Sequence, residues 1–154
     1  MALIIENGSI VANADSYVTV AEIRAYADKR GFDVPVADAT VEQLAILAND
    51  YLQSLNYIGD LVEKTQPLKW PRKNIIDVAN DTIPSDIKNA QIELAIAASD
   101  SELLTREQSA AVIKETIGNI ATDYAGNGVT SVFSSQRVSR YLGKYLVSAA
   151  VLRV

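Results

Sequence analysis

A run of apolar residues at helical spacing constrains the fold of this chain more than any other feature. Between residues 41 and 55 apolar side chains recur every three or four positions, as they do on one face of an α-helix. Thr40 and Gln43 have the spacing of a capping box, in which two side chains bond free backbone N–H groups at a helix start. We therefore predict a helix that follows Thr40 and ends near Tyr57, before Gly59.

A second capping box precedes another helical pattern. Thr19 and Glu22 have the same spacing, and Gly31 is a typical helix stop. These signals predict a helix over residues 20–30.

Two later segments also have helical patterns. Pro84 suits the first turn of a helix that reaches about Ser99. Because this segment is apolar on nearly every side, we expect a central helix or a subunit contact. A last helix is predicted over residues 135–147, with Arg137, Arg140 and Lys144 forming a basic stripe. Such a stripe is either a solvated face or a contact for phosphate or an acidic protein surface.

Two segments favour β-hairpins. Residues 3–12 place β-prone runs around Asn7-Gly8, a pair suited to a tight hairpin turn. Residues 111–125 place similar runs around Gly118-Asn119, although the alanines there also favour a helix. The predicted fold is therefore mainly α: a small bundle of about four helices with an N-terminal β-hairpin and a second hairpin near 111–125. The 154 residues suit a single domain, with a hairpin arm over 1–14 and a helix and apolar tail over 135–154.

The connection over residues 59–83 is long and carries the only tryptophan, Trp70. An indole in a loop usually fixes that loop to the core, so we predict Trp70 as a structural anchor. Lys69 and Arg72 are expected to face outward, and with Lys73 they are candidates for contact with a neighbouring subunit.

Charge is distributed unevenly along the chain. All 19 acidic residues lie at or before Asp123, whereas residues 126–154 carry four basic residues and no acid. This polarity favours docking on a charged partner or self-association, unless both parts lie together in one fold. The apolar tail after residue 148, with Val151 and Leu152, is predicted to contact a neighbouring chain.

The composition excludes several kinds of chemistry. The chain has no Cys and no His, so disulfides, thiolate nucleophiles, imidazole catalysis and the usual zinc sites are absent. We therefore expect no enzyme, no catalytic residue, no cofactor and no metal. No apolar run approaches the roughly 18–20 residues that span a bilayer, and a soluble protein without a membrane partner is expected.

Several segments of the chain form a recognisable series. They are Ala14-Asp15-Ser16-Tyr17-Val18-Thr19-Val20-Ala21-Glu22, Ala25-Tyr26-Ala27-Asp28-Lys29-Arg30-Gly31, Ala48-Asn49-Asp50-Tyr51-Leu52, Thr65-Gln66-Pro67-Leu68-Lys69-Trp70-Pro71-Arg72, Ile83-Pro84 and Lys88-Asn89-Ala90-Gln91-Ile92-Glu93-Leu94-Ala95. In their order and spacing, these segments resemble a family of tailed-phage head–tail connector or adaptor proteins, some of which are labelled DnaT-like single-stranded-DNA-binding proteins. The resemblance covers about residues 3–98.

The resemblance implies a structural virion protein. Its subunits would form a ring, of twelve copies in the family pattern, that docks on the portal protein and connects it to the next neck protein, a tail terminator or stopper. Genomic DNA would pass through the ring during packaging and ejection without specific binding. The implied location is the neck of the virion, and the host cytoplasm during assembly.

The alternative is a replication-type protein that binds single-stranded DNA. Such proteins combine a basic groove with aromatic rings on which bases stack. The candidates are Trp70 with Lys69, Arg72 and Lys73, or the basic stripe beside Tyr141 and Tyr145. The sequence pI of about 4.7 argues against this alternative.

Overall fold

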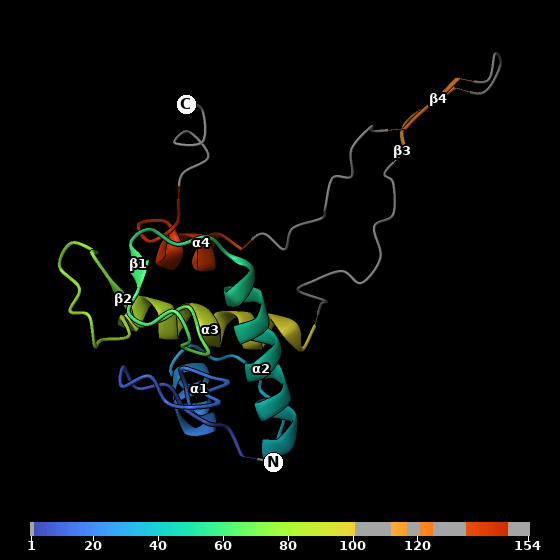
Figure 1. Ribbon diagram of the computed structural model, residues 1–154. Helices are drawn as coiled ribbons and strands as arrows, with labels where there is room; N and C mark the ends of the chain where they lie inside the picture. Colours follow the sequence, from blue (N-terminus) through green and yellow to red (C-terminus); the bar gives the residue numbers. More distant parts are fainter. Residues whose placement is uncertain (1, 101–111, 117–120, 125–134, 148–154) are drawn as a thin grey trace.

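The computed structural model describes residues 2–100, 112–116, 121–124 and 135–147. Its four helices confirm the predicted mainly-α class (Figure 1). They are α1 (Val20–Asp28), α2 (Asp38–Ser54), α3 (Ser85–Ala98) and α4 (Gln136–Leu142). Two antiparallel pairs of short strands accompany them: β1 (Asp60–Leu61) with β2 (Arg72–Lys73), and β3 (Val112–Thr116) with β4 (Ala121–Tyr124).

Helix α3 is the centre of the bundle. It packs against α2 and α4, with α1 on a further side (Figure 1). Most of its apolar side chains are buried, which agrees with a central helix, one of the two predicted alternatives, and the polar Gln91 is buried as well. The Gln91 amide donates to Ser16 Oγ and to the Ala45 carbonyl, both at 2.9 Å, and its oxygen accepts from the Tyr17 N–H. One buried amide thus joins α3 to α2 and to the segment before α1.

The two predicted capping boxes have different outcomes. At α1 the Thr19 hydroxyl and the Glu22 carboxylate bond each other's backbone N–H groups, which confirms the prediction. At α2 the prediction is wrong, because the helix begins at Asp38 without a side-chain cap and ends at Ser54. The reason lies in Arg24, which bonds the carbonyls of Pro35 and Val36 and the Asp38 carboxylate, and so holds the chain that enters α2.

The predicted N-terminal hairpin is also wrong. No strand pair is found within residues 3–12; instead Ile5 forms an isolated bridge with Ser16. The buried Glu6 carboxylate accepts from the backbone N–H groups of Gly8, Ile10 and Val11, which coils the segment around it. Gly8 adopts a φ of +106°, and a Cβ there would lie 1.8 Å from the Asp81 carbonyl oxygen. The glycine therefore serves a close backbone contact rather than a hairpin turn.

The second hairpin is confirmed by the pairing of β3 with β4, while its predicted turn at Gly118-Asn119 lies outside the described residues. The last helix is shorter than predicted, since α4 ends at Leu142. Residues 145–147 pair with residues 56–58 instead, through a Tyr57–Leu146 bridge, and this pairing replaces the final helical turn.

Candidate functional site

The long connection that contains Trp70 is folded against the bundle. Strands β1 and β2 close it, and Trp70 is completely buried. Its ring meets Tyr57 and Tyr145 edge-on, with centroids 5.7 and 5.3 Å apart. Its backbone N–H donates to the Tyr17 hydroxyl at 3.1 Å. A ring enclosed in this way has no free face on which a base could stack.

The expected outward position of Arg72 is wrong. Its side chain is buried, and its guanidinium donates to the carbonyls of Tyr57, Ile58, Gly59 and Lys69 at 2.8–3.4 Å. Burial lowers the pKa of Arg72, although four hydrogen bonds from its guanidinium to carbonyls stabilise the charged form.

The two lysines beside Arg72 are half-buried. The Lys69 ammonium donates to the Leu55 carbonyl, and burial lowers the pKa of Lys69. Lys73 belongs to β2, opposite Asp60. The cations around Trp70 thus lie largely within the fold, and they do not form an open basic surface.

The basic stripe of the last helix is divided between two places. Arg137 and Arg140 lie exposed on α4. Lys144 follows the end of the helix, and its ammonium pairs with Asp86 at 2.7 Å, which raises the pKa of Lys144. Val151 and Leu152 lie outside the described residues.

Arg137 and Arg140 border a groove of about 550 Å³ between α1, α3 and α4. Arg30, which follows α1, faces the same groove and was not predicted from the sequence. The lining residues are Tyr26, Arg30, Glu93, Arg137, Arg140 and Tyr141.

A hydrogen-bond network forms the floor of this groove. The Tyr26 hydroxyl donates to Glu93 Oε1 at 2.6 Å and lies 3.1 Å from the Tyr141 hydroxyl. Arg137 reaches the same carboxylate oxygen at 3.4 Å. Burial and then the bond to Glu93 raise the pKa of Tyr26. Because the network occupies the one carboxylate in the groove, the exposed arginines remain the dominant charges.

Aromatic rings hold two of the arginines. The Arg30 guanidinium lies 3.5 Å from the centre of the Tyr26 ring. The Arg137 guanidinium lies 4.9 Å from the centre of the Phe32 ring. Stacking of this kind limits the movement of a guanidinium. Nη1 of Arg137 also donates to Glu93 and Nη1 of Arg30 to the Tyr26 carbonyl, both at 3.4 Å, and each guanidinium has further N–H groups.

A second groove, of about 400 Å³, adjoins the first and shares Tyr26 and Arg30 with it. Lys29 and Lys88 also line it, and Lys88 lies 3.8 Å from the Glu22 carboxylate. The two grooves together present five cations that we call the basic track: Lys29, Arg30, Lys88, Arg137 and Arg140. No local sequence pattern brings these residues together, because they lie on α3, on α4 and directly after α1.

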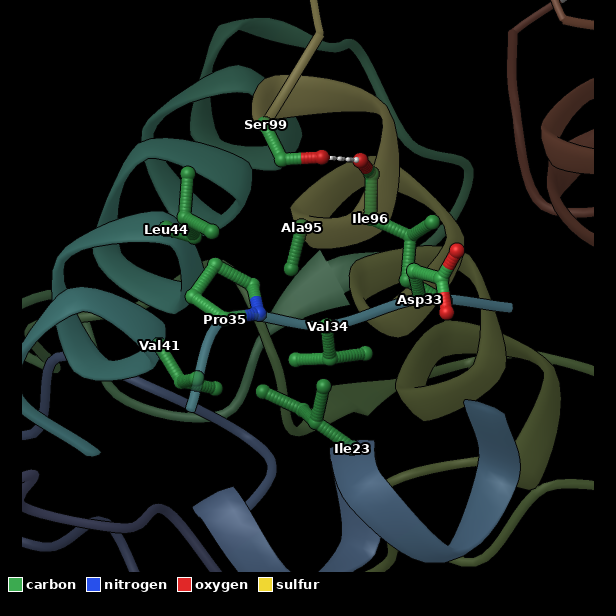
Figure 2. Close-up of a pocket in the computed structure, with 9 residues that line it drawn as sticks. All are labelled: Ile23, Asp33, Val34, Pro35, Val41, Leu44, Ala95, Ile96 and Ser99. Atoms are coloured by element: carbon green, nitrogen blue, oxygen red, sulfur yellow. Dashed lines mark hydrogen bonds between the residues drawn. The ribbon is translucent and has the colours of Figure 1, made fainter. Parts of the chain in front are cut away.

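Other features of the described structure give no site. The apolar pocket between α1, α2 and α3 is filled by Val34 and Pro35, and has no room for a water molecule (Figure 2). Within the described residues, His, Cys, Asp and Glu form no group that could hold a metal ion. None of the described helices has the length and apolar character needed to cross a membrane.

Comparison with known proteins gives one match. No curated protein and no solved structure matches the chain significantly. A family model described as "Putative DnaT-like ssDNA binding protein" matches residues 1–154, the whole length of the chain. The description agrees with the alternative interpretation of the sequence rather than with a head–tail connector. The chain belongs to this DnaT-like family.

Proposed function

We propose that this protein binds single-stranded DNA along the basic track. The observation that carries the proposal is the convergence of five cations, from α3, α4 and the end of α1, on two adjoining grooves that share Tyr26 and Arg30. The description of the family supports the same function. The track replaces both candidate sites predicted from the sequence, although Arg137, Arg140 and Tyr141 belong to one of them.

The chemistry of the track suits the backbone of a single strand. Arginine binds phosphate through two parallel N–H groups, and each neutralised phosphate releases counterions. Tyr141 is half-buried and lines the groove with Arg140, which makes it the candidate aromatic contact for a base. Contacts of this kind read the backbone and tolerate any base, so we expect little sequence preference.

The acidic balance of the whole chain sets the strength of binding. With a net charge of −5, the protein does not attract DNA over long distances, and only the track favours contact. For single strands, the logarithm of affinity changes with that of salt by about −0.7 per neutralised phosphate. Five contacts therefore predict a slope of about −3.5, and weak binding at physiological salt.

Fluorescence anisotropy with a labelled oligothymidine tests this proposal. Substituting Arg137→Ala and Arg140→Ala together should weaken binding by at least about tenfold, and should make the salt slope shallower by about 1.4. Lys64→Ala is the matched control, since Lys64 is exposed and lies outside both grooves. Thermal melting should show that all variants are folded. Absence of binding at low salt, or equal binding by the double variant, would contradict the proposal.

A second candidate is a subunit of the head–tail adaptor ring. It is favoured by the resemblance described above and by the acidic balance, because an acidic channel does not retain passing DNA. In this second candidate function, twelve copies form the ring, and the ring lies in the virion neck. Its partners are the portal and a tail terminator or stopper. In this case Arg137 and Arg140 would contact an acidic protein surface.

Native mass spectrometry with and without portal protein separates the two candidates. An adaptor should be monomeric or weakly associated alone, and should form a closed ring on the portal. A stable closed dimer under both conditions would contradict the adaptor candidate, while DNA binding would remain testable by anisotropy.

A further inference from the structure

One acidic side chain lies among the arginines of the basic track. Glu93 belongs to α3 and lines the larger groove together with Arg30, Arg137 and Arg140. Only 8% of its surface is exposed, which is unusual for a charged residue. A carboxylate repels the phosphates that the arginines attract, so it weakens the binding of a strand unless it also makes a favourable contact with that strand.

The hydrogen-bond network in the groove uses one of the two oxygens of Glu93. Oε1 accepts from the Tyr26 hydroxyl at 2.6 Å and from Arg137 at 3.4 Å. Oε2 accepts from no residue in the part of the chain that the structure describes. In that same part, Trp70 Nε1 is the only enclosed side-chain nitrogen or oxygen that lacks a partner. Oε2 of Glu93 is therefore not enclosed, and it is open to the groove that Glu93 lines.

The same network limits what Oε2 can bind. Tyr26 on α1 and Arg137 on α4 hold the carboxylate, so Oε2 keeps a fixed position beside the arginines. A carboxylate oxygen accepts hydrogen bonds and donates none. Its partner in the groove must therefore carry an N–H or O–H group, and the backbone phosphates of DNA carry neither.

The bases of DNA differ in the donors on their edges. Cytosine carries an amino group at N4, whereas thymine, the other pyrimidine, carries the acceptor O4 at the corresponding position. Carboxylates of Glu and Asp accept from the cytosine amino group in protein–DNA recognition. The groove has a volume of about 550 Å³, which is within the range of about 300–1,000 Å³ for ordinary ligand sites.

We propose that Glu93 gives the basic track a preference for cytosine over thymine. The preference rests on the proposed function, the binding of single-stranded DNA. Arg137 and Arg140 bind phosphates, one base enters the groove, and its N4 amino group donates to Oε2 of Glu93. The O4 atom of a thymine in the same place is repelled. The phosphate contacts themselves tolerate any base, so the preference arises at a single position in the strand.

Fluorescence anisotropy with three labelled oligonucleotides of equal length tests this preference. They are oligocytidine, oligothymidine and an oligomer of 2-pyrimidinone, which is cytosine without its amino group. A mildly alkaline buffer keeps cytosine neutral and the strands unpaired. The wild type should bind oligocytidine about five- to tenfold more tightly than either of the other two. Because the comparison with 2-pyrimidinone alters only the ligand, it does not depend on the folding of a variant.

Glu93→Gln separates the base contact from the charge. The glutamine oxygen can accept the bonds from Tyr26 and Arg137, which leaves an NH₂ donor in place of Oε2. All three oligonucleotides should then bind more tightly, because a negative charge is lost, and the preference for cytosine should disappear. Glu22→Gln is the matched control, since it removes a carboxylate charge from the second groove while glutamine keeps the capping box of α1. This control should keep the wild-type ratio of affinities.

Equal affinity of the wild type for oligocytidine and the 2-pyrimidinone oligomer would overturn the inference. A preference for cytosine that survives in Glu93→Gln would also overturn it, because another group would then contact the base. If oligothymidine binds and the double arginine variant weakens that binding, the DNA-binding proposal stands even without the preference. Absence of binding by all three oligonucleotides would contradict the DNA-binding proposal, and this inference with it.

Discussion

Trp70 and Arg72 lie two residues apart, and the sequence predicts the burial of Trp70 but not that of Arg72. The burial of an indole follows from its large apolar surface, and Trp70 is completely buried. A guanidinium is usually exposed, and nothing in the local sequence indicates that Arg72 is an exception. It is buried because the turn after α2 directs the carbonyls of Tyr57, Ile58 and Gly59 to one point.

The Arg72 contacts give a prediction about stability. Arg72→Lys should lower the free energy of unfolding by about 1.5–3 kcal/mol, because a lysine cannot satisfy several carbonyls that a planar guanidinium reaches together. Lys73→Arg is the neighbouring control, and should change it by no more than about 0.5 kcal/mol. Urea denaturation measures both. Equal unfolding midpoints would show that the carbonyls are satisfied without Arg72.

Among the secondary-structure elements, the helices were predicted more successfully than their ends. The apolar spacing in α2 and α3 predicts which faces of these helices are buried, and the structure buries those faces. Helix ends depend on contacts that local spacing does not contain. The start of α2 is set by Arg24 from α1, and the end of α4 by pairing with residues 56–58.

The two threonines at predicted capping boxes form a matched pair for experiment. Thr19→Ala should lower the free energy of unfolding by about 1 kcal/mol, since it removes the side-chain acceptor of the Glu22 N–H. Thr40→Ala should have little effect or stabilise slightly, because Thr40 lies inside the first turn of α2 and alanine is the better helix former. Thermal unfolding measures both changes. A loss of equal size at Thr40 would contradict the observed start of α2.

In the molecule as a whole, the ionisation of buried tyrosines makes stability depend on pH. The chain has no His, and burial raises the pKa values of Tyr17 and Tyr57 above the ordinary value of 10.0. Both hydroxyls lie at the junction of the Trp70 loop with the bundle: Tyr17 accepts from the Trp70 N–H, and Tyr57 donates to the Leu52 carbonyl. Ionisation of either one therefore opposes the same packing.

Stability should consequently decline in alkaline solution. Above pH 10.0 the unfolded chain loses these phenolic protons while the folded protein keeps them, so the free energy of unfolding falls as pH rises. Each tyrosine contributes up to about 1.4 kcal/mol per pH unit. Well below that pH the tyrosines are protonated in both the folded and the unfolded state, so they do not make the free energy of unfolding depend on pH.

Urea denaturation at a series of pH values tests this decline. Tyr57→Phe cannot ionise and should show a shallower fall than the wild type. Burial also lowers the pKa of Lys69, which acts in the opposite direction, so the comparison between the two proteins is the decisive measurement. Parallel curves for the two proteins would contradict the role assigned to Tyr57.

The sequence by itself determined the mainly-α class, the burial of α3 on several sides, the capping box of α1 and the hairpin within 111–125. Each of these follows from side-chain periodicity or from a bond between near neighbours in the chain. The tertiary structure decided the rest. Glu6 replaced the predicted N-terminal hairpin with a coil around its carboxylate, and the basic track assembled from Arg30, Lys88 and the arginines of α4. The track depends on contacts between residues far apart in sequence, whose energies no local pattern contains. The coil around Glu6 is made of local bonds, but the Ile5–Ser16 bridge and the close approach of Gly8 to Asp81 hold it in place.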